Sequence, residues 1–142
     1  MKANLYVFVA GLGLLAAAGP VLAHHSFTAE YDASKPVTIT GTVTKVEWMN
    51  PHARFYVDAK DETGKVINWE LELGSPNALM RLGWTRNSLK IGDQVTVEGS
   101  LAKDGSKLAN ARKVTLADGR KVFAGSALDQ ESKSDAPPAP GK

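Results

Sequence analysis

Short segments in which apolar and polar residues alternate constrain the fold of this 142-residue chain most strongly. Residues 37–43, 53–59 and 67–73 each place apolar side chains at every second position. A period of two is typical of a β-strand with one buried face. Beyond Val43 the apolar positions fall out of step by one residue, which would turn every side chain to the other face. The sequence therefore predicts a long first strand with a bulge or bend near Thr44.

A short helix is expected after the third strand. Ser75 suits the N-cap, Pro76 suits the first helical position, and Gly83 suits the helix end. Two further strands are expected over residues 95–101 and 108–116, and residues 121–123 could add a short edge strand.

Three strands, a helix and two strands is the chain order of the OB-fold. We therefore expect an all-β, five-stranded, OB-fold-like Greek-key barrel with one short helix between strands 3 and 4. The alternative is a generic small barrel or sandwich with an incidental helix.

The first 23 residues have the pattern of a cleavable signal peptide that precedes the barrel. Lys2 stands before an apolar run, Pro20 breaks that run, and small residues end at Ala23. The run is shorter than the roughly 20 apolar residues that span a bilayer. We expect cleavage after Ala23 and no membrane anchor afterwards; an uncleaved anchor is the alternative.

The remaining chain divides into three parts by composition. Residues 24–36 are expected to form a short polar arm, residues 37–126 the barrel domain, and residues 127–142 a disordered tail rich in Ser, Asp, Pro and Ala. The formal net charge is only +2, which argues against a nucleic-acid partner. The absence of cysteine excludes disulfides and thiolate chemistry. No catalytic motif stands out, so we do not expect an enzyme.

The three histidines suggest one specific chemistry, a metal site. Cleavage after Ala23 would make His24 the first residue, so its α-amine and ring nitrogen could chelate one ion. Amine and imidazole nitrogens suit copper, which heads the divalent affinity order. His52 could complete a three-nitrogen site, or His25 could serve instead. Residues that could add oxygen ligands or hold the site in place are Glu30, Asp32 and Glu47. Alternatively, His24 and His25 merely begin a flexible arm, and His52 caps a turn.

A second hypothesis concerns the outer face of the predicted strands. Arg54, Tyr56 and Asn68 alternate with core positions, and OB-folds use aromatic and polar side chains there to bind ligands. They would bind a protein, glycan or small-molecule partner without any metal. Glu70 and Glu72 share this strand pattern, and we expect them to form a solvated face rather than a catalytic pair.

Several runs in the chain resemble a known family. They are His-His-Ser-Phe at 24–27, Asn-Pro-His-Ala at 50–53 and Glu-Leu-Gly-Ser-Pro-Asn at 72–77. The chain resembles a family of small exported bacterial proteins catalogued as a domain of unknown function. That resemblance implies a periplasmic location and brings no established activity, ligand or partner.

Overall fold

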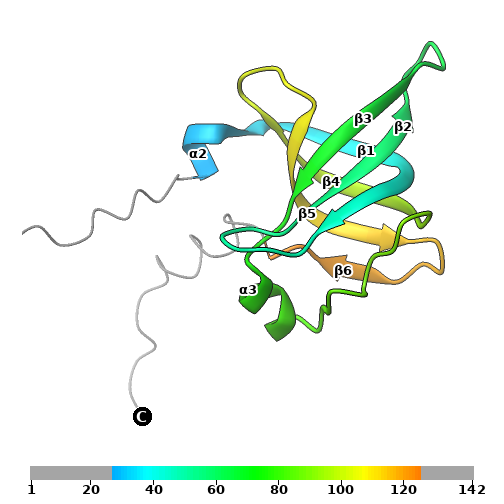
Figure 1. Cartoon of the computed structure of the whole chain (residues 1–142). Coiled ribbons are helices and arrows are strands. Elements are labelled where there is room, and N and C mark those ends of the chain that lie inside the picture. The colour runs from blue at the N-terminus through cyan, green and yellow to red at the C-terminus, as the bar shows by residue number, and fades with distance from the viewer. Residues whose placement is uncertain (1–26, 126–142) are drawn as a thin grey trace, which may run out of the picture.

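The computed structural model describes residues 27–125, and this part of the chain is mainly β-structure (Figure 1). Its strands are β1 (Tyr31–Glu47), β2 (Arg54–Lys60), β3 (Val66–Glu72), β4 (Gln94–Ala102), β5 (Leu108–Leu116) and β6 (Lys121–Phe123). Two short helices accompany them, α2 (Phe27–Glu30) and α3 (Pro76–Arg81).

The strands form one sheet that closes on itself. Their order is β3-β2-β1-β4-β5-β6, and an additional parallel pairing joins β3 to β5. The other pairings are antiparallel. Helix α3 lies between β3 and β4 in the chain. This strand order and closure confirm the predicted OB-fold, and β6 extends β5 as the expected edge strand.

Strand β1 is shared by both halves of the barrel. Its first part pairs with β4 as far as Thr42, and its second part pairs with β2 from Thr42 onward. The β1–β2 register shifts between Val43 and Lys45, which confirms the predicted bulge. At Gly41 an added Cβ would lie 2.1 Å from the carbonyl oxygen of Asp58. The backbones of β1 and β2 therefore lie so close together at this position that only glycine fits.

The start of β1 differs from the expectation. The strand begins at Tyr31, within the segment expected to be a polar arm, and α2 precedes it. The reason is a small apolar cluster, separate from the main core, made by Phe27, Tyr31 and Ala102 with Leu108 against it. Tyr31 pairs with Ala102 of β4, so this cluster fixes the first strand residue to the barrel.

The main core fills the barrel. Phe55 of β2, Leu71 of β3 and Leu79 of α3 are fully buried in it, so α3 packs against the barrel interior. Ser75 caps α3 by accepting a hydrogen bond from the backbone N–H of Ala78, as its sequence position predicts. The strands and α3 thus form a rigid frame for the loop between β1 and β2.

Candidate functional site

The loop between β1 and β2 carries His52 to one side of β3. Backbone hydrogen bonds between Ala53 and Leu73 and between Ala53 and Gly74 fix the end of this loop to the end of β3. As a result Nδ1 of His52 lies 3.0 Å from Oε1 of Glu72. The His52 side chain is 35% exposed and that of Glu72 only 5% exposed. Because an ionised carboxylate only accepts hydrogen bonds, Nδ1 of His52 is the donor.

Arg54 holds the same carboxylate from the other side. Its guanidinium donates to Oε2 of Glu72 at 3.3 Å and to Oε1 of Glu70 at 2.6 Å. Burial alone would lower the pKa of Arg54, but the charges of Glu70 and Glu72 raise it above its ordinary value. A buried carboxylate needs such partners, since an unpaired buried charge is strongly destabilising. Glu72 is therefore held in one position between a cation and an imidazole.

Tyr31, the first residue of β1, lies beside this site. Tyr31 is 2% exposed, and its ring stacks on Phe27 with centroids 5.4 Å apart. Burial, followed by the negative charge of Glu72, raises the pKa of the Tyr31 phenol well above its ordinary value. The hydroxyl lies near that carboxylate, but within residues 27–125 it makes no hydrogen bond of ordinary geometry. Tyr31, against which Phe27 of α2 packs, thus lies close to Glu72.

This arrangement prepares one nitrogen of His52 for a ligand. With Nδ1 donating to Glu72, the neutral ring presents the lone pair of Nε2 on its other side. A carboxylate that fixes the far nitrogen is the usual support of a metal-bound histidine. Within residues 27–125, no group of three or more His, Cys, Asp or Glu side chains is placed to hold a metal. A metal site here would need ligands from outside that range, and the predicted ligands His24 and His25 lie outside it.

The predicted oxygen ligands Glu30, Asp32 and Glu47 form no metal-binding group with His52 within residues 27–125. Asp32 accepts hydrogen bonds from the backbone and hydroxyl of Ser34. Glu47 pairs with Lys45 and accepts a hydrogen bond from the Tyr56 hydroxyl at 3.2 Å. The carboxylate beside His52 is instead Glu72, which we expected to be solvated. Strand alternation could not reveal its burial, because its neighbours Tyr31 and Asn110 come from other strands.

The three residues predicted to bind a ligand do lie on one outer face, on β2 and β3. Arg54 is opposite Glu72, Tyr56 opposite Glu70, and Asn68 opposite Asp58. Each polar group is already occupied by a neighbour in the described structure. The Asn68 amide donates to Asp58 at 2.7 Å and to Thr44 at 3.2 Å. A ligand on this face would have to compete with these bonds.

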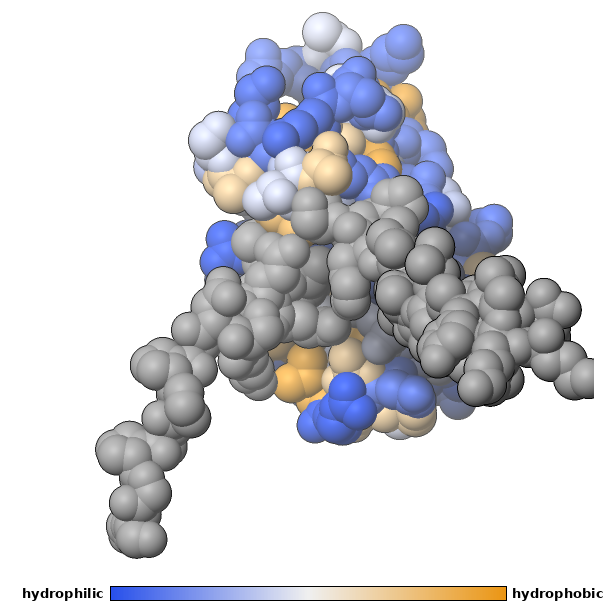
Figure 2. Space-filling view, turned by 90° about the vertical axis from the view of Figure 1, so that its left-hand side faces the viewer, coloured by the Kyte–Doolittle hydropathy of each residue, from blue (hydrophilic) through white to orange (hydrophobic). Residues whose placement is uncertain are grey.

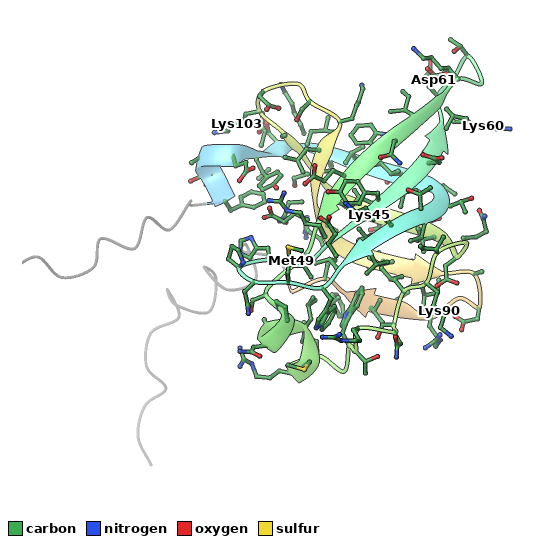
Figure 3. The ribbon with its side chains drawn as sticks, viewed as in Figure 1. Lys45, Met49, Lys60, Asp61, Lys90 and Lys103 are labelled. Carbon is green, nitrogen blue, oxygen red and sulfur yellow. The ribbon has the colours of Figure 1, made fainter. Side chains whose placement is uncertain are left out.

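Tyr56 is occupied on its ring as well as at its hydroxyl. The Lys45 ammonium lies over the Tyr56 ring, 5.0 Å from its centroid, and Figure 3 shows Lys45 on this side of the barrel. Burial and the nearby charge of Glu70 raise the pKa of the Tyr56 phenol. The cation already fills the position over the ring where a sugar or base would stack. Stacking of a ligand on Tyr56 would therefore first require Lys45 to move.

Comparison with known proteins places the chain in a family. The sequence model described as "Family of unknown function (DUF6152)" matches residues 11–111. The chain belongs to this family. No curated protein matches this DUF6152 protein. Among solved structures, the mitochondrial single-stranded DNA-binding protein Rim1 of S. cerevisiae is 12% identical, with a TM-score of 0.46; the match covers 58% of this chain and 93% of that chain.

One face of this DUF6152 protein carries both polar and apolar residues where it is visible. Figure 2 shows hydrophilic residues over the visible upper part of this face and a smaller apolar area near its lower end. In Figure 3, Met49 of the β1–β2 loop lies on the same side of the barrel as α2. No helix within residues 27–125 is long and apolar enough to cross a membrane.

Proposed function

We propose that this DUF6152 protein is an exported, periplasmic metal-binding protein whose preferred ion is Cu(II). His52 supplies one ring nitrogen, and His24, once it is the first residue, supplies its α-amine and its ring nitrogen. His25 is the reserve ligand. The single observation that carries the proposal is the 3.0 Å hydrogen bond from His52 Nδ1 to the buried Glu72.

The hydrogen bond to Glu72 matters because it selects the tautomer. A histidine that merely caps a turn needs no buried carboxylate behind it. Here the carboxylate is itself held by Arg54, so the imidazole is oriented before any ligand arrives. Supports of this kind typically contribute 10- to 100-fold to metal affinity. The fixed orientation of His52 therefore meets one requirement of a metal site with nitrogen ligands.

The anchoring of α2 supports the participation of His24. Phe27 is 2% exposed and stacks on Tyr31, whose phenol senses the charge of Glu72. His24 precedes Phe27 by three residues, and three residues of chain span at most about 10 Å. The first residue of a chain cleaved after Ala23 therefore starts from an anchor that lies close to the His52–Glu72 pair.

The donor set favours copper over the harder cations. Three nitrogen ligands, one of them an amine, suit Cu(II), whereas Mg²⁺ and Ca²⁺ prefer oxygen ligands. An α-amine has an ordinary pKa of about 7.7–8.0, so a metal can displace its proton at neutral pH at small cost. An ion bound in this way would be carried, stored or sensed, and the site has no feature that assigns it a catalytic role.

The alternative function, an OB-type domain that binds a protein, glycan or small molecule through Arg54, Tyr56 and Asn68, has less support. All three side chains share one face, as that function requires. Their polar groups are nevertheless bound to Glu70, Glu72, Glu47 and Asp58. The metal proposal uses a histidine nitrogen that the Glu72 hydrogen bond leaves available.

The test is a calorimetric titration with Cu(II) of protein processed in the periplasm, its first residue confirmed by mass spectrometry. We expect one-to-one binding tighter than micromolar, weakened at least about tenfold in His52→Ala, which loses one ligand. A variant with one Gly before His24 should be weakened as well, because its first chelate ring is lost. Asp58→Asn changes one charge on the same strand face away from His52, and it should bind copper like the parent.

The outcomes separate the two functions. Binding no tighter than micromolar, or binding indifferent to both His52→Ala and the extra Gly, would overturn the metal proposal. The search would then move to partners of the face that carries Arg54 and Tyr56.

A further inference from the structure

Two buried oxygen atoms near the site lack hydrogen-bond partners. Within the part of the chain that the structure describes, they are the hydroxyl of Tyr31 and the side-chain oxygen of Asn110. Tyr31 is 2% exposed and Asn110 1% exposed. Buried polar groups are almost always hydrogen-bonded, so an unpartnered one points to a missing water, ion or ligand. Two such atoms in one small domain call for an explanation.

Both atoms belong to residues that surround Glu72. Asn110 of β5 is the direct cross-strand neighbour of Glu72 of β3. Tyr31 lies near the same carboxylate, because the Glu72 charge acts on its phenol. Ser100, which pairs with Asn110 across β4 and β5, adds a third polar residue that is 1% exposed. We call Tyr31, Glu72 and Asn110 the oxygen cluster.

The chemistry of the oxygen cluster defines its ligand. The Asn110 oxygen can only accept hydrogen bonds, and Glu72 uses two of its roughly four acceptor positions for His52 and Arg54. The Tyr31 hydroxyl can accept as well as donate. A matching group must therefore present several N–H donors from one atom and tolerate a neighbouring negative charge. A primary ammonium group has three donors and a positive charge, and meets both demands.

We propose that the oxygen cluster binds the α-ammonium group of the mature amino terminus when no metal is present. The occupant is the chain itself, beginning at His24. Its first nitrogen is separated from the buried Phe27 by three residues, a span of at most about 10 Å, and Phe27 stacks directly on Tyr31. The cluster and the end of the chain are therefore within reach of each other.

This inference rests on the cleavage assumed in the proposed function and deepens it. An amine held at Glu72 lies beside His52, because one carboxylate contacts both. The amine is then positioned before the metal arrives, so less conformational freedom remains to be lost on binding. The inference also explains why the oxygens of Tyr31 and Asn110 are buried without partners among residues 27–125.

The experiment measures the reactivity of the His24 α-amine in metal-free, processed protein kept in EDTA. The protein is treated briefly with an acetylating reagent at neutral pH, and peptide mass spectrometry compares His24 with Lys60. Lys60 is an exposed reference at the tip of the β2–β3 hairpin, far from α2 in Figure 3. We expect His24 to react about tenfold more slowly, relative to Lys60, than in a variant with Gly-Gly before His24.

Two substitutions make the test specific to the oxygen cluster. Tyr31→Phe removes only the hydroxyl and keeps the ring that stacks on Phe27, and Asn110→Ser shortens the side chain but keeps a polar group. Each should raise the relative reactivity of His24 toward that of the Gly-Gly variant. Equal reactivity in the parent and the Gly-Gly variant would overturn the inference. Because copper is absent from this experiment, that result would leave the metal proposal unaffected. Protection of His24 in a protein that does not bind copper tightly would support this inference and overturn the metal proposal.

Discussion

Nδ1 of His52 and Oε1 of Glu72 lie 3.0 Å apart, and the second oxygen of that carboxylate accepts from Arg54 at 3.3 Å. The two residues come from different elements, the β1–β2 loop and the end of β3. Because the Glu72 side chain is only 5% exposed, the contact is more than a surface hydrogen bond: the carboxylate meets little bulk water with which to exchange partners. The orientation of His52 therefore depends on a buried carboxylate that Arg54 also binds.

Removing the charge of Glu72 should weaken copper binding. Glu72→Gln keeps an oxygen that can accept from His52, but it removes the negative charge that makes the imidazole a stronger ligand. We expect the Cu(II) affinity to fall about 10-fold or more. A competition titration against a chelator of known affinity measures the change.

Glu70→Gln is the matched control for that experiment. It removes a charge from the other partner of Arg54, but Glu70 has no hydrogen bond to His52. Its copper affinity should stay within about threefold of the parent, as expected for a charge that is 30% exposed. Equal losses in the two variants would show that net charge, rather than the contact with His52, determines affinity.

Loss of the Phe27 anchor should loosen α2 before the barrel. Phe27→Ala removes a buried ring from a small separate cluster, and we expect it to lower the free energy of unfolding by about 3 kcal/mol, the low end for such changes. Hydrogen exchange should rise most in residues 27–31. Phe123→Ala, at a position 66% exposed, should change neither quantity appreciably. Equal effects of the two substitutions on exchange in residues 27–31 would contradict the anchoring role.

Gly41 should not tolerate a side chain. An added Cβ would lie 2.1 Å from the Asp58 carbonyl oxygen, so β1 and β2 would have to separate. We expect Gly41→Ala to lower the free energy of unfolding by about 3 kcal/mol, measured by urea denaturation. Thr38→Ala, at an exposed position of the same strand, should cost about 0.5 kcal/mol or less. Similar costs for both would mean that the strands do not approach so closely.

The stability of the protein should fall in alkali because of Tyr31. Burial and the charge of Glu72 raise the pKa of its phenol above the ordinary 10.0, whereas the unfolded chain ionises near that value. The unfolded state therefore loses its proton first, so this contribution to stability is complete below about pH 10 and declines above it. In urea denaturation at increasing pH, Tyr31→Phe should reduce that decline. If stability declines equally in Tyr31→Phe and in the parent, ionisation of Tyr31 is not the cause of the decline.

Local sequence patterns were sufficient to predict the barrel. The alternation over residues 53–59 and 67–73 predicts two strands of the structure, and the phase slip after Val43 predicts the bulge in β1. Ser75 and Pro76 predict the start of α3. These features depend on neighbours in the chain, so the sequence contains their signal directly.

The site itself was only partly predictable. His52 was identified because histidine is scarce in this chain, but its partner Glu72 was expected to be solvated. Glu72 pairs with Asn110 of β5 and lies near Tyr31 of β1, so its surroundings come from strands far away in the chain. A period-two pattern reports which face of a strand a residue occupies and contains no information on what later covers that face.

The most direct test of the metal proposal is the EPR spectrum of Cu(II) bound to the processed protein at one equivalent. The account predicts coupling to three nitrogen atoms: the amine and the ring of His24 and the ring of His52. His52→Ala should reduce the coupling to two nitrogens. A parent spectrum that His52→Ala leaves unchanged would contradict the account, because it would show that the copper never contacts the histidine that Glu72 holds in place.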